Sequence, residues 1–193
     1  MRPLHHLARR FPKLAVAGYF KTSDATGIYG TAGSYNCIAW AANDERRWWW
    51  PDSDAYWPPW IKHREPTVAC FVKTFKSLGY RVCANSDREP GYDKVVLYAI
   101  HNSRKQQMPP QQWQDMRDWA PTHMARQLPD GTWTSKCGGN EDITHLTLDA
   151  VESYGPWWIC EEYGCPIVYM KRLTPVSGFV ALVQRIAWRR GWF

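Results

Sequence analysis

The chain lacks a long apolar run, a paired-cysteine metal motif and a dense stripe of basic residues. None of its apolar stretches is long enough to cross a bilayer, and none forms the apolar centre of a signal peptide. The six cysteines include no Cys-x-x-Cys motif, so we expect reduced thiols, no metal and no cofactor. The formal net charge of +6 is scattered in small groups, which disfavours a dedicated nucleic-acid binder. We therefore expect a protein that is cytoplasmic as made, with export as a toxin or effector left open.

Tryptophan, by contrast, is abundant. Several of the 13 tryptophans stand close together in a proline-containing segment: Trp48, Trp49, Trp50, Trp57 and Trp60. The prolines exclude a regular helix or a central strand there. The segment therefore forms either a wall that stacks on a ligand or a lid packed over a neighbouring helix. We favour the lid, because a monomer seldom exposes so much aromatic area.

A cysteine stands where a helix is expected to begin. Asn36 is a good N-cap, and Cys37 follows it at the start of the run Ile-Ala-Trp-Ala-Ala. The positive end of a helix favours the thiolate, so Cys37 is a candidate nucleophile. The plainer interpretation is a small buried residue on a core helix.

A histidine begins a strand much further along the chain. Two strands, 122–128 and 132–137, are predicted on either side of an Asp-Gly turn, and His123 lies near the start of the first. Counting back from a two-residue turn pairs Arg126 with Ser135, which returns the second strand to the level of His123. Ser135 or Thr134 is therefore the candidate for orienting the imidazole, and His145 is the reserve histidine. Each of these residues is also compatible with a purely structural role.

The remaining pattern indicates an α+β fold. The clearest helix spans 67–78, with strands at 80–83, 94–100 and 167–172 and further helices at 111–119, 142–153 and 179–190. No internal repeat is visible. We predict one domain over residues 1–173 and a basic amphipathic helical extension over 174–193.

Several motifs resemble a family of small, largely uncharacterised bacterial proteins. They include Tyr-Asn-Cys-Ile-Ala-Trp-Ala at 35–41, Trp-Trp-Trp-Pro at 48–51 and the Thr-His-Met-Ala-Arg-Gln-Leu-Pro-Asp-Gly run at 122–131. The resemblance covers about residues 8–173, with 156–161 as an insertion. More distantly, the chain is similar to the papain-like amidohydrolases of the CHAP and NlpC type. That resemblance implies a papain-like domain in which Cys37 is the nucleophile, His123 the base and Ser135 near the orienting position.

Two functional hypotheses follow. The first is a cysteine-dependent amide or peptide hydrolase, or acyl-transfer enzyme, that forms a thioester. Its substrate would be a peptide, a protein or peptidoglycan, and the hypothesis leaves room for a protein partner or inhibitor. The residues predicted to bind the substrate are Trp48, Trp49, Trp57, Arg126, Gln127 and Lys136. The second is a non-catalytic interaction module that binds a protein or a glycan through its tryptophan-rich face. It predicts a buried Cys37 that His123 does not reach. A basic nucleic-acid binder is the least favoured alternative.

Overall fold

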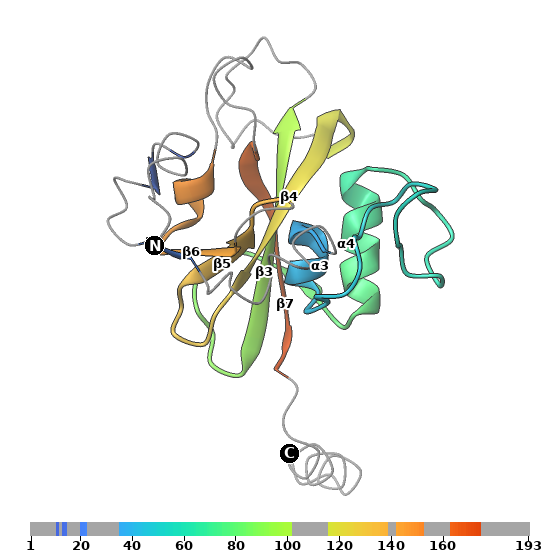
Figure 1. Ribbon diagram of the computed structural model, residues 1–193. Coiled ribbons are helices and arrows are strands. Elements are labelled where there is room, and N and C mark those ends of the chain that lie inside the picture. Colours follow the sequence, from blue (N-terminus) through green and yellow to red (C-terminus); the bar gives the residue numbers. More distant parts are fainter. Residues whose placement is uncertain are drawn as a thin grey trace, which may run out of the picture.

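A computed structural model describes residues 11, 13–14, 20–22, 35–101, 116–138, 142–152 and 163–174. They form an antiparallel sheet with two α-helices lying together against one of its faces (Figure 1). The predicted α+β class is confirmed. The predicted helix at 179–190 lies outside the described residues, as does all of the proposed C-terminal extension after Thr174. None of the helices in the described part is long and apolar enough to cross a membrane.

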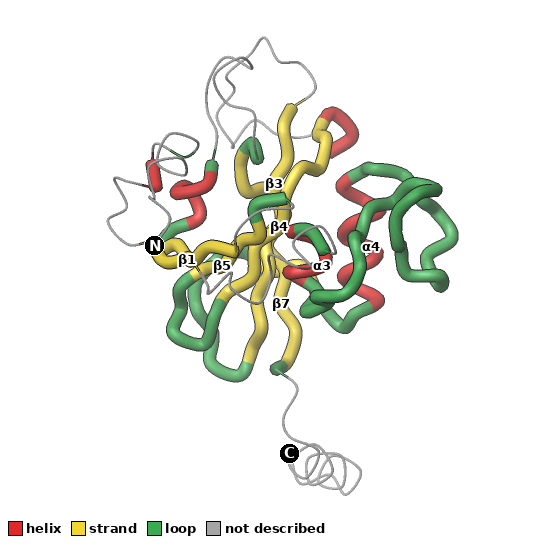
Figure 2. Tube along the Cα trace, viewed as in Figure 1, coloured by secondary structure: helices red, strands yellow, loops and turns green. Residues whose placement is uncertain are grey.

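The sheet contains seven strands in the order β1-β6-β5-β4-β3-β7-β2, and every pairing is antiparallel. The strands are β1 (Phe20–Thr22), β2 (Arg81–Cys83), β3 (Tyr92–His101), β4 (Trp119–Gln127), β5 (Trp133–Lys136), β6 (Asp142–His145) and β7 (Cys165–Leu173). The long strands β3 and β4 lie at its centre (Figure 2). The four strands predicted at 80–83, 94–100, 122–128 and 132–137 correspond to β2, β3, β4 and β5, and the one at 167–172 to β7.

The two α-helices are α3 (Cys37–Ala41) and α4 (Val68–Ser77). In α4, the Thr67 side chain caps the first turn by accepting a hydrogen bond from the Cys70 amide at 3.2 Å. Phe71 and Phe75 project from one face of the helix into the core. The helix ends before Gly79, whose φ of 88° is a conformation that favours glycine. The helix predicted over 67–78 is thus confirmed.

Each face of the sheet has its own apolar core. The helical face packs α3, α4 and the tryptophan segment against residues such as Leu97 and Met124. The opposite face packs Val96, Tyr98 and Ala125 beneath the 3₁₀-helix η4 (Leu148–Val151). Neighbouring residues along β3 and β4 therefore face different cores, as the two-residue period of a strand requires.

Residues 142–153 differ from the helix predicted there. The described residues of this segment, 142–152, form β6, followed by η4. Ile143 and Thr144 are β-branched residues that suit a strand, and they pair with Ser135 and Thr134 of β5. In the predicted helix of 111–119, the described residues form a single 3₁₀ turn, η3 (Met116–Asp118), before β4 begins at Trp119.

The turn between β4 and β5 contains one residue more than the Asp-Gly count assumes. Leu128 and Thr132 close a loop of three residues, in which Gly131 adopts a φ of 93°. Ser135 therefore pairs with Ala125 and not with Arg126. A shift of one residue moves a side chain to the other face of a sheet. The corrected register places Ser135 on the same face as Ala125.

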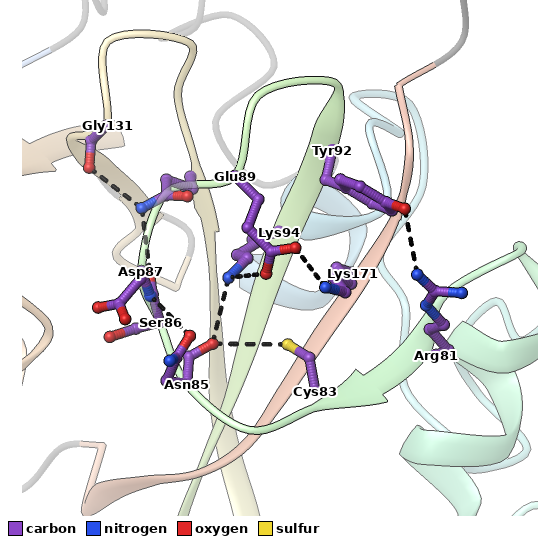
Figure 3. A network of polar contacts seen from close by, with 11 residues as sticks. Arg81, Cys83, Asn85, Ser86, Asp87, Glu89, Tyr92, Lys94, Gly131 and Lys171 are labelled. Carbon is purple, nitrogen blue, oxygen red and sulfur yellow. Dashed lines mark hydrogen bonds and ion pairs between the residues drawn. The ribbon is translucent and has the colours of Figure 1, made fainter.

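A glutamate fastens the loop before β3 to the sheet. Glu89 forms an ion pair with Lys94 of β3 at 2.7 Å and another with Lys171 of β7 (Figure 3). The Lys94 ammonium is buried and also donates to the Asn85 carbonyl at 3.4 Å. Hydrogen bonds from Lys171 and Lys94 lower the pKa of Glu89 to about 2. This network neutralises a buried lysine and fixes the path of residues 85–89.

Candidate functional site

Asn36 fixes both the start of α3 and the tryptophan segment. Its side-chain oxygen accepts a hydrogen bond from the Ala39 amide at 3.1 Å, as a helix cap does. Its side-chain nitrogen donates to the Trp49 carbonyl at 2.7 Å. The predicted cap is confirmed, and the same side chain ties residue 49 to the helix that begins at Cys37.

Cys37 is the first residue of α3, and its thiol is buried in the helical core. Only 5% of the residue is exposed. Burial raises the pKa of Cys37 to about 11, although backbone amides, Met124 foremost, and the charge of Lys136 act in the opposite direction. The expectation of a thiolate favoured by the helix terminus is therefore wrong, because desolvation outweighs that effect. Cys37 is a protonated thiol at neutral pH.

His123 is fully buried and points to the other face of the sheet. Its partner in β3 is Tyr98, which belongs to the core opposite the helices. The imidazole stacks on Tyr163 with 3.7 Å between ring centroids. Met124, the next residue along β4, packs in the helical core with Cys37. Alternation along β4 thus directs the imidazole away from the face that α3 covers.

Ser135 joins His123 to His145. The Ser135 Oγ lies 3.0 Å from Nε2 of His123 and 2.9 Å from Nε2 of His145. The predicted contact between His123 and Ser135 is present, and the reserve histidine joins it from β6. All three side chains are fully buried.

The hydrogen bonds that link His123, Ser135 and His145 have one consistent set of donors and acceptors when both imidazole rings are neutral. Nδ1 of His145 lies 2.7 Å from the Thr147 carbonyl, which can only accept, so this nitrogen carries the proton. Nε2 of His145 then accepts from the Ser135 hydroxyl. The Ser135 oxygen in turn accepts from Nε2 of His123. This assignment satisfies the serine hydroxyl as both donor and acceptor in a place that water does not reach.

The structure does not form the predicted thiol–imidazole pair. In the described part of the chain, no hydrogen bond joins the Cys37 thiol to the His123 ring, and the two side chains extend to opposite faces of β4. A nucleophilic pair needs a base within hydrogen-bond reach of the thiol. The Cys37 and His123 side chains do not meet that condition in this conformation.

Lys136 also lies out of reach of a substrate. It is fully buried and forms an ion pair with Asp142 at 3.7 Å. Its ammonium lies 4.8 Å from the centre of the Tyr35 ring, and the Tyr35 hydroxyl donates to Asp142 at 3.0 Å. Burial raises the pKa of Tyr35, so the phenol stays protonated and can donate. These three residues stabilise the β5–β6 end of the helical face, which corrects the substrate-binding role predicted for Lys136.

Three further predicted binding residues are held in structural contacts. Trp57 is 2% exposed and packs edge-on against Phe71 with ring centroids 5.3 Å apart. Gln127 donates to the carbonyls of Ser86 and Gly131 at 3.2 and 3.3 Å and so braces the hairpin. The half-buried Arg126 places its guanidinium carbon 3.9 Å from the centre of the Trp40 ring.

A groove of about 540 Å³ lies beside the C-terminus of α3. We call it the aromatic groove. It is lined by residues 42–47 and by Trp49, Tyr56, Trp60 and Leu78. The predicted residue Trp49 lines it, whereas Trp48, which is 40% exposed, is not among its lining residues. Its size is within the usual range for small-ligand sites.

The end of α3 shapes one wall of the aromatic groove. Asn43 has a φ of 61°, and the amides of Asn43 and Asp44 donate to Trp40 and Ala39 in a Schellman motif. This turn directs Asp44 to the Trp49 indole, whose Nε1 donates to its carboxylate at 2.8 Å. Hydrogen bonds from the Trp49 side chain and the Arg46 amide, with Arg47 nearby, lower the pKa of Asp44 despite its partial burial.

The sequence pattern indicates only part of this wall. Trp49 and Trp60 stand out as tryptophans beside prolines, but Asp44 and Glu45 carry no motif of their own. Their place in the groove depends on the left-handed Asn43, which the sequence signals only as a residue that tolerates that conformation. In the described part of the chain, no group of three or more metal-binding side chains comes together.

The comparisons with known proteins give a family and no activity. No curated protein and no solved structure matches the chain. Residues 27–171 match the model of a family described as a domain of unknown function, DUF7689. This segment contains both α3 and the strands that carry His123 and Ser135, and it spans well over half of the chain. The chain therefore belongs to the DUF7689 family.

Proposed function

We propose that this protein is a non-catalytic binding module whose ligand lies in the aromatic groove. One observation carries the proposal: an aromatic-lined groove of about 540 Å³ opens beside α3, while the Cys37 thiol at the other end of that helix is buried and protonated. The interaction-module hypothesis predicts both a buried Cys37 and a His123 that does not reach it. The geometry agrees with both expectations.

The groove is preorganised for binding. Asn36 fastens the backbone of Trp49, and Asp44 fastens its indole. The guanidinium of Arg47 lies 3.8 Å from the centre of the Tyr56 ring and also pairs with Asp44 at 2.8 Å. Walls that are fixed before the ligand arrives lose little conformational entropy on binding, which favours affinity.

The papain-like hydrolase remains the alternative proposal. A short helix that begins with Cys37 and packs on an antiparallel sheet containing His123 supports it, as does the contact between His123 and Ser135. It would require the thiol and the imidazole to approach each other from the two faces of β4. We therefore rank it second.

Ligand binding is tested with arrays of immobilised glycans and peptides, probed with the wild-type protein and with the variant Trp60→Ala. Trp60 is 58% exposed, so its removal should leave the fold intact. We expect a ligand signal that the variant loses. Equal signals from both proteins would contradict a role for the groove, and cleavage of a peptide that depends on Cys37 would support the hydrolase.

A further inference from the structure

We infer that the ligand of the aromatic groove is a neutral oligosaccharide of pyranose units; the inference rests on the binding function proposed above. A pyranose ring presents an apolar face of C–H groups and a rim of hydroxyls. It therefore needs an exposed aromatic ring with side-chain donors and acceptors beside it. The groove supplies each of these.

Trp60 is the stacking platform. It is the most exposed aromatic residue of the groove, at 58%, and its indole Nε1 donates to Ser77 Oγ of α4 at 2.9 Å. This hydrogen bond restrains the indole, and more than half of the residue remains exposed to solvent. Tyr56 is less suited to stacking because the Arg47 guanidinium covers its ring.

Glu45 and Arg46 are placed to bind hydroxyl groups. Both are exposed residues of the groove wall, and neither side chain forms a hydrogen bond or ion pair within the described part of the chain. The Glu45 carboxylate can accept from one hydroxyl, and the Arg46 guanidinium can donate to another. Because each sugar hydroxyl both donates and accepts, the two side chains are complementary to it.

The charge of the groove indicates a neutral ligand. Its lining includes two carboxylates, Asp44 and Glu45, and two guanidinium groups, Arg46 and Arg47. These charges balance, so the groove has no net attraction for a polyanion such as a nucleic acid or for a polycation.

The indole groups argue against a proline-rich peptide, the other common ligand of aromatic grooves. Such a peptide has free backbone carbonyls that need donors from the groove. The indole N–H groups of Trp49 and Trp60 are already bonded to Asp44 and Ser77. Of the other side-chain donors, Arg47 already pairs with Asp44, which leaves Arg46 for the row of carbonyls that such a peptide presents, so the peptide is kept as the competing class in the test.

The test is calorimetric titration of the full chain with three neutral oligosaccharides, cellohexaose, fully N-acetylated chitohexaose and maltohexaose, with a soluble proline-rich peptide as the competing class. The variants are Trp60→Ala and Glu45→Gln, and Trp48→Ala is the matched control because Trp48 is an exposed tryptophan outside the groove lining. We expect at least one hexaose to bind. Trp60→Ala should weaken it about tenfold or more, by loss of roughly 1.4 kcal/mol of stacking. Trp48→Ala should leave binding within about twofold, with unchanged melting temperatures for every variant.

Each other outcome overturns a defined part of the reasoning. If the peptide binds in a Trp60-dependent way and no hexaose does, the ligand class is wrong while the groove remains the binding site. If a hexaose binds but Trp60→Ala and Trp48→Ala weaken it equally, the site is wrong. If neither class binds, both the inference and the proposed binding function fail.

Discussion

Protonation of His145 is expected to destabilise this fold in mild acid. The ring is fully buried, and its two nitrogens lie 2.9 Å from Ser135 Oγ and 2.7 Å from the Thr147 carbonyl. Burial lowers the pKa of His145 from 6.5 to about 4, although the Thr147 carbonyl and Asp149 act in the opposite direction. A protonated ring would need to donate to Ser135, whose hydroxyl would have to reverse its direction.

The sign and size of the effect follow from linkage. The pKa is lower in the folded state than in the unfolded chain, so protons bind the unfolded chain more readily. The contribution of His145 to stability is complete above pH 6.5 and is lost as the pH falls towards 4. With a shift from 6.5 to about 4, the loss is about 1.4 kcal/mol at pH 5.5 and about 3 kcal/mol at pH 4. Such a loss is a large fraction of the stability of an ordinary domain.

The assay is urea unfolding followed by tryptophan fluorescence at about pH 7.5, 6.5, 5.5 and 4.5. The wild type is compared with His145→Gln, which cannot take up the proton, and with His63→Gln at an exposed histidine. Glu89, with a pKa of about 2, titrates below this range and does not interfere. We expect the fall in the free energy of unfolding between pH 7.5 and pH 5.5 to be smaller by about 1.4 kcal/mol in His145→Gln and unchanged in His63→Gln. Parallel pH curves for wild type and His145→Gln would refute the reasoning.

Three further predictions concern the thiol, the serine bridge and a buried glycine. Cys37 should react with iodoacetamide much more slowly than the partly exposed Cys83 at neutral pH, because its pKa is about 11; fast labelling of Cys37, mapped by mass spectrometry, would contradict this. Ser135→Ala should lower the free energy of unfolding by about 1–3 kcal/mol, since two buried ring nitrogens lose their partner; an unchanged urea midpoint would argue against the bridge. Gly164→Ala should lower the free energy of unfolding, measured in urea, by on the order of 3 kcal/mol or more, because the added Cβ would lie 2.0 Å from a backbone oxygen of β3. Gly138 has a similar positive φ but open space around it, so Gly138→Ala should lower the free energy of unfolding by only about 1 kcal/mol in the same urea experiment. Equal losses in the two variants would contradict the predicted clash at Gly164.

The local pattern was sufficient for the elements whose signals lie within a few residues. The apolar spacing and the following Gly79 identify α4, and Asn36 identifies the start of α3. The strands β3, β4 and β5 are recognisable because β-branched and apolar residues stand between clear turn signals. Helix caps, periodicity and turn residues act locally, so a single chain contains their information.

The register of the hairpin shows where local reasoning stops. Asp130 and Gly131 predict a turn, but two-residue and three-residue hairpin loops contain similar residues. That difference of one residue decides which face Ser135 occupies. Packing of Ala125 and Ile143 in the same core is consistent with the longer loop. The helix expected at 142–153 was wrong for a related reason, since β5 offers β6 a partner that the segment alone does not reveal.

The sequence by itself determined the α+β class, the helix that begins at Cys37 and the existence of the β4–β5 hairpin, whereas the register that brings Ser135 to His123 came from the tertiary structure. Only the tertiary structure decided that Cys37 is buried with a raised pKa, that His123 faces the other core, and that residues 42–47 line a groove with Trp60. The physical reason is that a pKa, an exposed face and a groove depend on solvent exclusion by segments distant in the chain. Local propensity specifies the helices and strands, and long-range packing decides which of their side chains are exposed to solvent.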